Sequence, residues 1–309
     1  MSLVPTGTLL KVSHFQTPLD LVSLAVSPCS VVPSTTSRPI TPLSQPSTSS
    51  ASPAPTEDVK AFAIGLAECD EMVSEMLAID SRMSQLKGLQ YNGGPLLDLL
   101  TTPPAIEFME DIEPSAAPAF FASEEKRIEH WLNYELTMAT EWMKTHIVFR
   151  KLTFFDKCTM MEDTMLAVVL LNAACEAAAR GERELRYPDG SAMRFSDECG
   201  NVADLVDAMA RSSMDKAMFV LVRALTFLNP DAFGLTPEGR AKVDAERRRI
   251  MHALGTYIFH RHGKKSPGML GEVLAMPATA LALGRRVRVS PPAPAPLLFV
   301  KGPLPALMT

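Results

Sequence analysis

The chain has 309 residues, of which 21% are charged, and a formal net charge of -5 at pH 7. This length allows one or two domains with a full buried core. The charge gives no overall basic field, which argues against direct binding of nucleic acid. Five scattered cysteines without a CxxC pair predict reduced thiols in an intracellular protein rather than a zinc module or a disulfide framework.

Residues 1–56 are rich in serine, threonine and proline. Such a segment cannot bury enough apolar surface to offset the entropy cost of ordering, so a disordered leader is predicted. A first amphipathic helix is predicted from Thr56 to just before Gly88, with acidic residues in its first turn. The connection over residues 89–122 contains Gly93-Gly94-Pro95 and Pro103-Pro104, and residues 96–100 leave room for one short helical turn.

Two helices with different surfaces are predicted next. Apolar side chains recur at steps of three and four over residues 128–142, which indicates a helix starting near Ser123. After a short link, Asp156 is expected to accept hydrogen bonds from the free amides of a second helix beginning at Lys157. Residues 165–175 include one polar side chain, as expected of a helix packed on all sides. Eleven residues are fewer than the roughly 20 that cross a bilayer, so no membrane span is expected.

The second half of the chain predicts one turn and three helices. Pro188-Asp189-Gly190 lies between two short extended runs and predicts a small β-hairpin over residues 185–195. Helical patterning resumes near residue 201 and is clear over residues 214–228. Thr236 is a predicted N-cap with Pro237 at the first helical position. The last helix starts at Ser266-Pro267 and is expected to kink at Pro277.

Two stretches of this sequence resemble the signatures of the nuclear receptor ligand-binding domain. The first consists of Trp142-Met143-Lys144, Phe149, Leu152, Asp156 and Met160-Met161. The second runs over residues 223–231 and continues as Gly234-Leu235-Thr236-Pro237-Glu238-Gly239. Lys157 and Met165 depart from the family pattern, which usually has glutamine and often tryptophan there. The resemblance implies a ligand-binding domain at 57–284, which follows the leader at 1–56 and precedes an atypical proline-rich tail at 285–309.

The resemblance implies an all-α, three-layer antiparallel helical sandwich with one small β-hairpin and an internal ligand cavity. The positions that match the family's cavity are Ile128, Trp131, Leu132, Glu135, Met165, Leu166, Val169, Leu170, Ala173 and Glu176. Most are apolar, as a lipid-like ligand requires, but a stripe at helical spacing more often belongs to a plain core. Glu176 stands where receptors for acids and phenols commonly have arginine, which disfavours acidic ligands.

The resemblance also implies a coregulator groove that contains Lys144, Phe149 and Met161. The family's matching lysine holds the free carbonyls at the end of a partner's LxxLL helix. The plain interpretation of Lys144 is a cation at a helix end that reaches solvent. No acidic residue follows Glu272, so the last part of the chain cannot supply the glutamate that completes this grip.

Four further positions match the structural signature, namely Trp142, Leu152, Asp156 and Arg223. In many receptors the matching arginine pairs with a glutamate on the central helix, and that position is Ala167 here. Arg223 is therefore expected to be solvated or to pair with Asp231.

No nucleophile elbow, phosphate-binding glycine loop, zinc motif or paired-cysteine site occurs, so neither an enzyme nor a cofactor is predicted. We expect a regulator of transcription that is located in the nucleus, with the cytoplasm as a second location, and that binds a lipophilic ligand, LxxLL-type coregulator helices, or both. It is expected to form a homodimer or a heterodimer with another receptor. The eight cysteines of the family's DNA-binding domain are missing, so direct DNA binding is not expected. The alternative is a ligand-free helical scaffold or adaptor.

Overall fold

The computed structural model describes residues 57–289, apart from residues 95, 117, 119 and 195–201. These residues form one compact unit. The expectations for the leader and for residues 290–309 lie outside the described residues. The α-helices of the described part are α1 (Glu57–Gly88), α2 (Leu96–Thr101), α3 (Glu124–Thr145), α4 (Ile147–Arg150), α5 (Phe154–Arg180), α6 (Ala203–Arg211), α7 (Lys216–Phe227), α8 (Pro237–His262) and α9 (Ser266–Val289).

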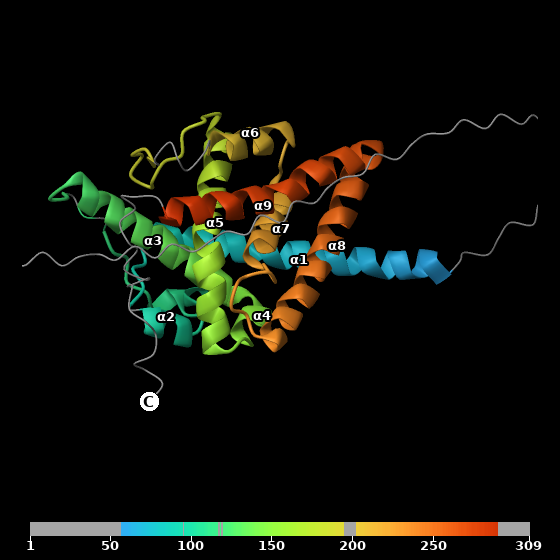
Figure 1. The fold of residues 1–309 in the computed structure, drawn as a ribbon, viewed down its shortest axis with the longest axis horizontal. Helices are drawn as coiled ribbons and strands as arrows, with labels where there is room; N and C mark the ends of the chain where they lie inside the picture. The colour runs from blue at the N-terminus through green and yellow to red at the C-terminus, as the bar shows by residue number, and fades with distance from the viewer. Residues whose placement is uncertain (1–56, 95, 117, 119, 195–201, 290–309) are drawn as a thin grey trace, which may run out of the picture. The chain divides into compact units, whose positions relative to one another are not determined.

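The helices are layered around α5 and α7. Helix α5 packs against α3, α6, α7 and α9, while α7 also packs against α1 and α8. In Figure 1, α5 runs across the directions of α1 and α9, so that the middle of the unit is built by crossing helices. Together with the resemblance described above, this confirms the predicted all-α helical sandwich of the ligand-binding type.

Helix α5 is buried along most of its length, as its apolar sequence predicts. Its 27 residues are more than the eleven on which the sequence-based exclusion of a membrane span rested. By length and composition, α5 and the helical run Pro237–Arg288 are two stretches of the described chain that could cross a membrane. The apolar window of α5 is 67% buried inside the unit, so its burial, and not its length, favours a core helix over a span.

The start of α5 differs from the prediction. The helix begins at Phe154 and its N-cap is Thr153, whose hydroxyl accepts a hydrogen bond from the backbone amide of Asp156. Asp156 is therefore inside the first turn and is not the cap. The Thr153 hydroxyl in turn donates to the Asp156 carboxylate, and the apolar pair after Thr153 hid this pattern. The predicted cap of α8 is confirmed, because the Thr236 hydroxyl accepts from the amide of Gly239.

The expected β-hairpin is reduced to a tight turn. Gly190 has a φ of 81°, which the turn after Pro188-Asp189 requires. The amide of Tyr187 donates to the carbonyl of Ser191 at 2.8 Å, and one isolated antiparallel bridge joins Arg186 to Ala192. The paired stretch is too short for a strand among the described residues, and Phe195 lies outside them.

The connection before α3 is more ordered than the sequence indicates. The expected short turn is confirmed as α2, and two 3-10 helices follow it, η1 (Ala105–Glu107) and η2 (Met109–Asp111). Ala105 and Ile106 of η1 are buried. Part of this segment therefore covers the helical unit instead of forming a free loop.

Helix α9 crosses α5 at a point where neither helix has a large side chain. A Cβ atom on Gly284 would lie 2.8 Å from the backbone nitrogen of Ala167 and 3.2 Å from its Cα. The helix continues through Pro277 to Val289, and beyond the crossing Arg285 pairs with Asp163 of α5 at 2.9 Å. Small residues at the crossing allow the two backbones to approach.

We predict that Gly284→Ala lowers the free energy of unfolding by about 1–3 kcal/mol, because the added methyl group meets backbone atoms that cannot rotate away. The matched control is Gly271→Ala in the same helix, where no atom lies within 4 Å of the new Cβ. Gly271→Ala should raise the free energy of unfolding by up to about 1 kcal/mol, because alanine favours the helical conformation more than glycine does. Chemical denaturation measures both, and equal effects would show that the crossing is not tight.

Candidate functional site

The two signature stretches meet at Asp156. One carboxylate oxygen accepts from the backbone amide of Thr236 at 2.8 Å, and the other accepts from the Thr236 hydroxyl at 2.8 Å. The Thr153 hydroxyl also donates to this second carboxylate oxygen at 2.9 Å. Burial favours a raised pKa for Asp156, but the hydrogen bonds from Thr236 and Thr153 outweigh it and hold the pKa below its usual value. A charged carboxylate thus joins the start of α5 to the start of α8.

A Cβ atom on Gly239 would lie 2.6 Å from a carboxylate oxygen of Asp156. Glycine is therefore required at this position for the two helix starts to come together. The link gives a structural reason for the glycine in the second stretch, next to the threonine that caps the helix.

Arg223 is the second point at which distant segments meet. Its guanidinium pairs with Asp80 of α1 at 2.8 Å and lies 4.4 Å from the ring centroid of Trp142. The side chain of Arg223 is only 7% exposed. The expectation that Arg223 is solvated or pairs with Asp231 was wrong, because α1 supplies the carboxylate that the central helix lacks.

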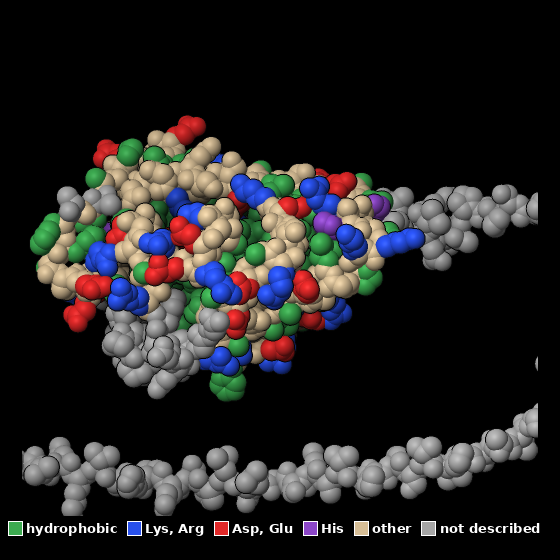
Figure 2. All heavy atoms as spheres, turned by 90° about the horizontal axis from the view of Figure 1, so that it is seen from above, with side chains coloured by type: hydrophobic (Ala, Val, Ile, Leu, Met, Phe, Trp, Pro, Cys, Tyr) green, Lys and Arg blue, Asp and Glu red, His purple; other side chains and the backbone are tan. Residues whose placement is uncertain are grey.

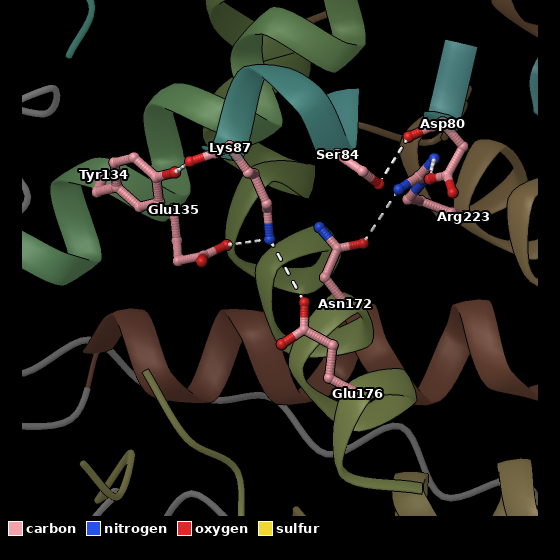
Figure 3. A network of polar contacts seen from close by, with 8 residues as sticks. All are labelled: Asp80, Ser84, Lys87, Tyr134, Glu135, Asn172, Glu176 and Arg223. Atoms are coloured by element: carbon pink, nitrogen blue, oxygen red, sulfur yellow. Dashed lines mark hydrogen bonds and ion pairs between the residues drawn. The ribbon is translucent and has the colours of Figure 1, made fainter. Parts of the chain in front are cut away.

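A second cluster of polar contacts lies near the one around Arg223 (Figure 3). Lys87 of α1 places its amine 3.5 Å from carboxylate oxygens of both Glu135 and Glu176. Glu135 is buried whereas Glu176 is exposed, and Tyr134 donates its hydroxyl to the Lys87 carbonyl at 2.9 Å. Burial raises the pKa of Glu135, and the charge of Lys87 opposes this shift.

The other eight positions matched to a ligand cavity belong to the helical core or border it. Trp131, Met165, Val169, Leu170 and Ala173 are buried in the main hydrophobic cluster, and Ile128, Leu132 and Leu166 are partly buried against it. Trp131 also lines an open surface groove whose remaining walls are Pro118, Phe120, Phe121, Ser123, Glu124, Arg127 and Asp189. The predicted cavity residues are thus brought together mainly by mutual packing.

The predicted coregulator residues are covered in this structure. Phe149 and Met161 are each 1% exposed and Lys144 is 3% exposed. The amine of Lys144 lies 2.8 Å from Glu141 one turn earlier and donates to the Thr102 hydroxyl at 3.3 Å. The plain interpretation of Lys144 as a solvated helix end was therefore wrong.

Glu141 completes a buried cluster at the end of α3. Its second carboxylate oxygen accepts from the backbone amide of Ala105 at 2.7 Å. Burial lowers the pKa of Lys144 and raises that of Glu141, whereas their contact favours the charged form of both. An uncompensated charge in this position would be costly, so each group depends on the other.

Three partners in these clusters were missed from the sequence. Asp80 stands on the apolar stripe of the first helix, and a carboxylate on a buried face signals a buried cation. Glu141 precedes Lys144 by three residues, a spacing at which side chains on a helix meet. Lys87 gave no such signal, because its partners come from helices that are distant in sequence.

The described part of the chain holds no candidate metal centre, and the face drawn in Figure 2 carries no broad basic patch. No group of three or more histidine, cysteine or acidic side chains is placed to hold a metal ion within these residues. Figure 2 shows acidic and basic side chains interspersed on one face. This face therefore gives no single-sign field for a nucleic acid.

No protein family model matches this chain, but its sequence is similar to nuclear hormone receptors of Caenorhabditis elegans. It is 26% identical over 180 residues to family member nhr-40, 29% identical over 140 residues to nuclear hormone receptor 114 and 23% identical over 226 residues to family member nhr-154. These matches cover 50%, 42% and 66% of this chain and 40%, 33% and 48% of the respective receptors. The chain spans less than half the length of these curated relatives. The resemblance inferred from the two signature stretches is confirmed.

We predict that Asp80→Asn lowers the free energy of unfolding by about 3–5 kcal/mol, because it leaves the buried guanidinium of Arg223 without a compensating charge. Asp207→Asn is the matched control, since Asp207 pairs with the largely exposed Arg183 and should contribute less than about 1 kcal/mol. Urea denaturation compares the two variants. Similar losses would mean that the Arg223 pair is no more important than a surface pair.

His146 predicts a pH dependence of stability. Burial, followed by the nearby charge of Arg223, lowers its pKa to about 3, whereas an unfolded histidine has a pKa of about 6.5. Between these two pH values only the unfolded state binds a proton at His146. The contribution of His146 to the free energy of unfolding is therefore complete above about pH 6.5 and is lost as the pH falls toward about 3.

We therefore expect His146→Phe to flatten the fall of Tm measured from about pH 7 to about pH 4. An unchanged slope in the His146 variant would contradict the assignment.

Proposed function

We propose that this chain is a nuclear receptor-like regulator of transcription whose helical unit binds a hydrophobic small molecule, coregulator helices, or both. The coarse part of this statement follows from the similarity to nuclear hormone receptors. The proposal includes a nuclear location, dimerisation with a receptor chain and the absence of catalysis. Binding of a ligand and of coregulator helices by the helical unit goes beyond what the similarity to these receptors supports.

The observation that carries the proposal is the meeting of the two signature stretches. They are about 80 residues apart, yet Asp156 of the first contacts Thr236 of the second in two hydrogen bonds. Arg223 of the second stretch also lies over the ring of Trp142 in the first. Residues that resemble one family in sequence thus support one another in space, which is what a shared architecture requires.

The proposed ligand is hydrophobic and not acidic. The positions on α3 and α5 that match a cavity are mostly apolar, which suits a lipid-like molecule. At one end of this region two carboxylates share the single charge of Lys87. A further carboxylate from a ligand would be repelled there, so fatty acids are disfavoured.

One observation favours the alternative of a ligand-free scaffold. Five of the ten matched cavity positions are already buried in the main hydrophobic cluster. A core filled by its own side chains leaves no room for a small molecule, and such a unit would act only by binding other proteins. The two functions differ in whether the purified chain retains a hydrophobic compound.

We predict that mass spectrometry of the purified chain detects a retained hydrophobic molecule, and that Ala173→Phe abolishes the retention because the larger ring takes the space of the ligand. Ala173 is buried on α5, and the exposed Ala179 on the same helix provides the matched control Ala179→Phe. Thermal unfolding monitors whether each variant is folded.

In parallel, a peptide that forms a two-turn leucine-containing helix is titrated against the wild type. Saturable binding is expected if the chain engages coregulators. A wild type that retains no hydrophobic molecule and binds no helix would leave the scaffold as the better description.

A further inference from the structure

The surface at the end of α3 is covered by a short piece of the same chain. Thr102, which follows α2 directly, accepts the hydrogen bond from Lys144, and Ala105 of η1 donates to Glu141. Leu99 and Leu100 of α2 are 2% and 4% exposed. We call residues 96–102 the α2 cover, since they bury apolar surface and provide a polar partner for Lys144.

The sequence of the α2 cover is that of a small apolar helix. Leucines occupy positions 96, 97, 99 and 100 around Asp98, so residues 96, 99 and 100 have the i, i+3, i+4 spacing of one helical face. The amine of Lys144 binds Thr102 at the carboxyl end of this helix. A cation at that end also favours the negative pole of the helix dipole.

The two ends of the cover are held differently. On the carboxyl side, η1 is fixed by the Ala105 amide on Glu141, by the guanidinium of Arg82 on the Ile106 carbonyl and by an ion pair between Arg150 and Glu107. On the amino side the chain passes through Gly93 and Gly94. A Cβ atom on Gly93 would lie 2.8 Å from the Cδ1 atom of Leu99 and from the Cγ2 atom of Thr137, so a larger residue at this position would force these two side chains to shift.

The cover has little stability of its own. Isolated helices shorter than about 12–15 residues are marginal in water, and α2 has six residues. It therefore persists through the packing of Leu99 and Leu100 and through the bond between Thr102 and Lys144. Another helix that brings the same leucine spacing and the same polar end can replace these contacts.

We propose that the α2 cover occupies a docking surface for a leucine-containing helix of a partner protein, and that the partner binds only when the cover is displaced. This inference rests on the proposed coregulator binding and adds that the surface is closed from within. Displacement frees the amine of Lys144 on one side, while Glu141 keeps its bond to Ala105. The partner helix then supplies the acceptor that Thr102 gives up.

The probe for this proposal is a labelled peptide with the chain's own residues 94–104, titrated in trans against the full chain and followed by fluorescence anisotropy. Gly93→Ala pushes against Leu99 and Thr137 and loosens the cover. Gly94→Ala is the matched control, because its nearest neighbour, Asp98, would lie at an ordinary 3.8 Å. Since binding is weakened by the fraction of closed molecules, Gly93→Ala should bind about tenfold more tightly than the wild type and than Gly94→Ala.

A second variant, Leu99→Ser with Leu100→Ser, removes the apolar contacts of the cover and should give the same gain. Circular dichroism and thermal unfolding show that the variants are folded. Saturable binding with equal affinity for all the proteins would overturn the cover while coregulator binding stands. Absence of binding even to the double variant would overturn both the docking surface and the coregulator part of the proposed function.

Discussion

The buried guanidinium of Arg223 is the interaction on which the arrangement of the helices depends most. It belongs to α7, pairs with Asp80 of α1 and lies over the ring of Trp142 in α3. A buried cation is tolerated only where a carboxylate and polar or aromatic groups compensate it. The correct placing of three helices is therefore tied to one charged group. The polar cluster in Figure 3 extends this dependence to α5 through Asn172, 3.5 Å from Arg223.

The middle of the unit is otherwise held by close approach and apolar packing. Gly284 allows α9 to reach the backbone of α5, and Gly239 allows the start of α8 to reach Asp156. Both are positions where the absence of a side chain permits contact between elements distant in sequence. The charged clusters set which helices meet, whereas these small residues set how closely they meet.

The sequence predicted elements whose signals are local. The apolar run of α5, the Thr236 cap and the short helix at residues 96–100 each follow from neighbouring residues, and each is confirmed. The cap of α5 and the partner of Arg223 were predicted wrongly. The first depends on a competition between Thr153 and Asp156, and the second on a carboxylate from a helix more than 140 residues away.

The placement of the candidate site residues shows the same division. Periodicity indicated that the positions on α3 and α5 would share an apolar region, but it does not tell a packed core from a cavity. The burial of Lys144 depends on a segment about 40 residues earlier in the chain, which no spacing within α3 could reveal. Long-range contacts of this kind are fixed by the fold as a whole.

The carboxylate of Asp156 has a further consequence for local unfolding. Because it ties the first turn of α5 to the first turn of α8, fraying of either helix end removes a partner from the other. Helix ends normally open independently and at small cost. Here the two ends should exchange their amide hydrogens as one cooperative group, although 80 residues of chain separate them.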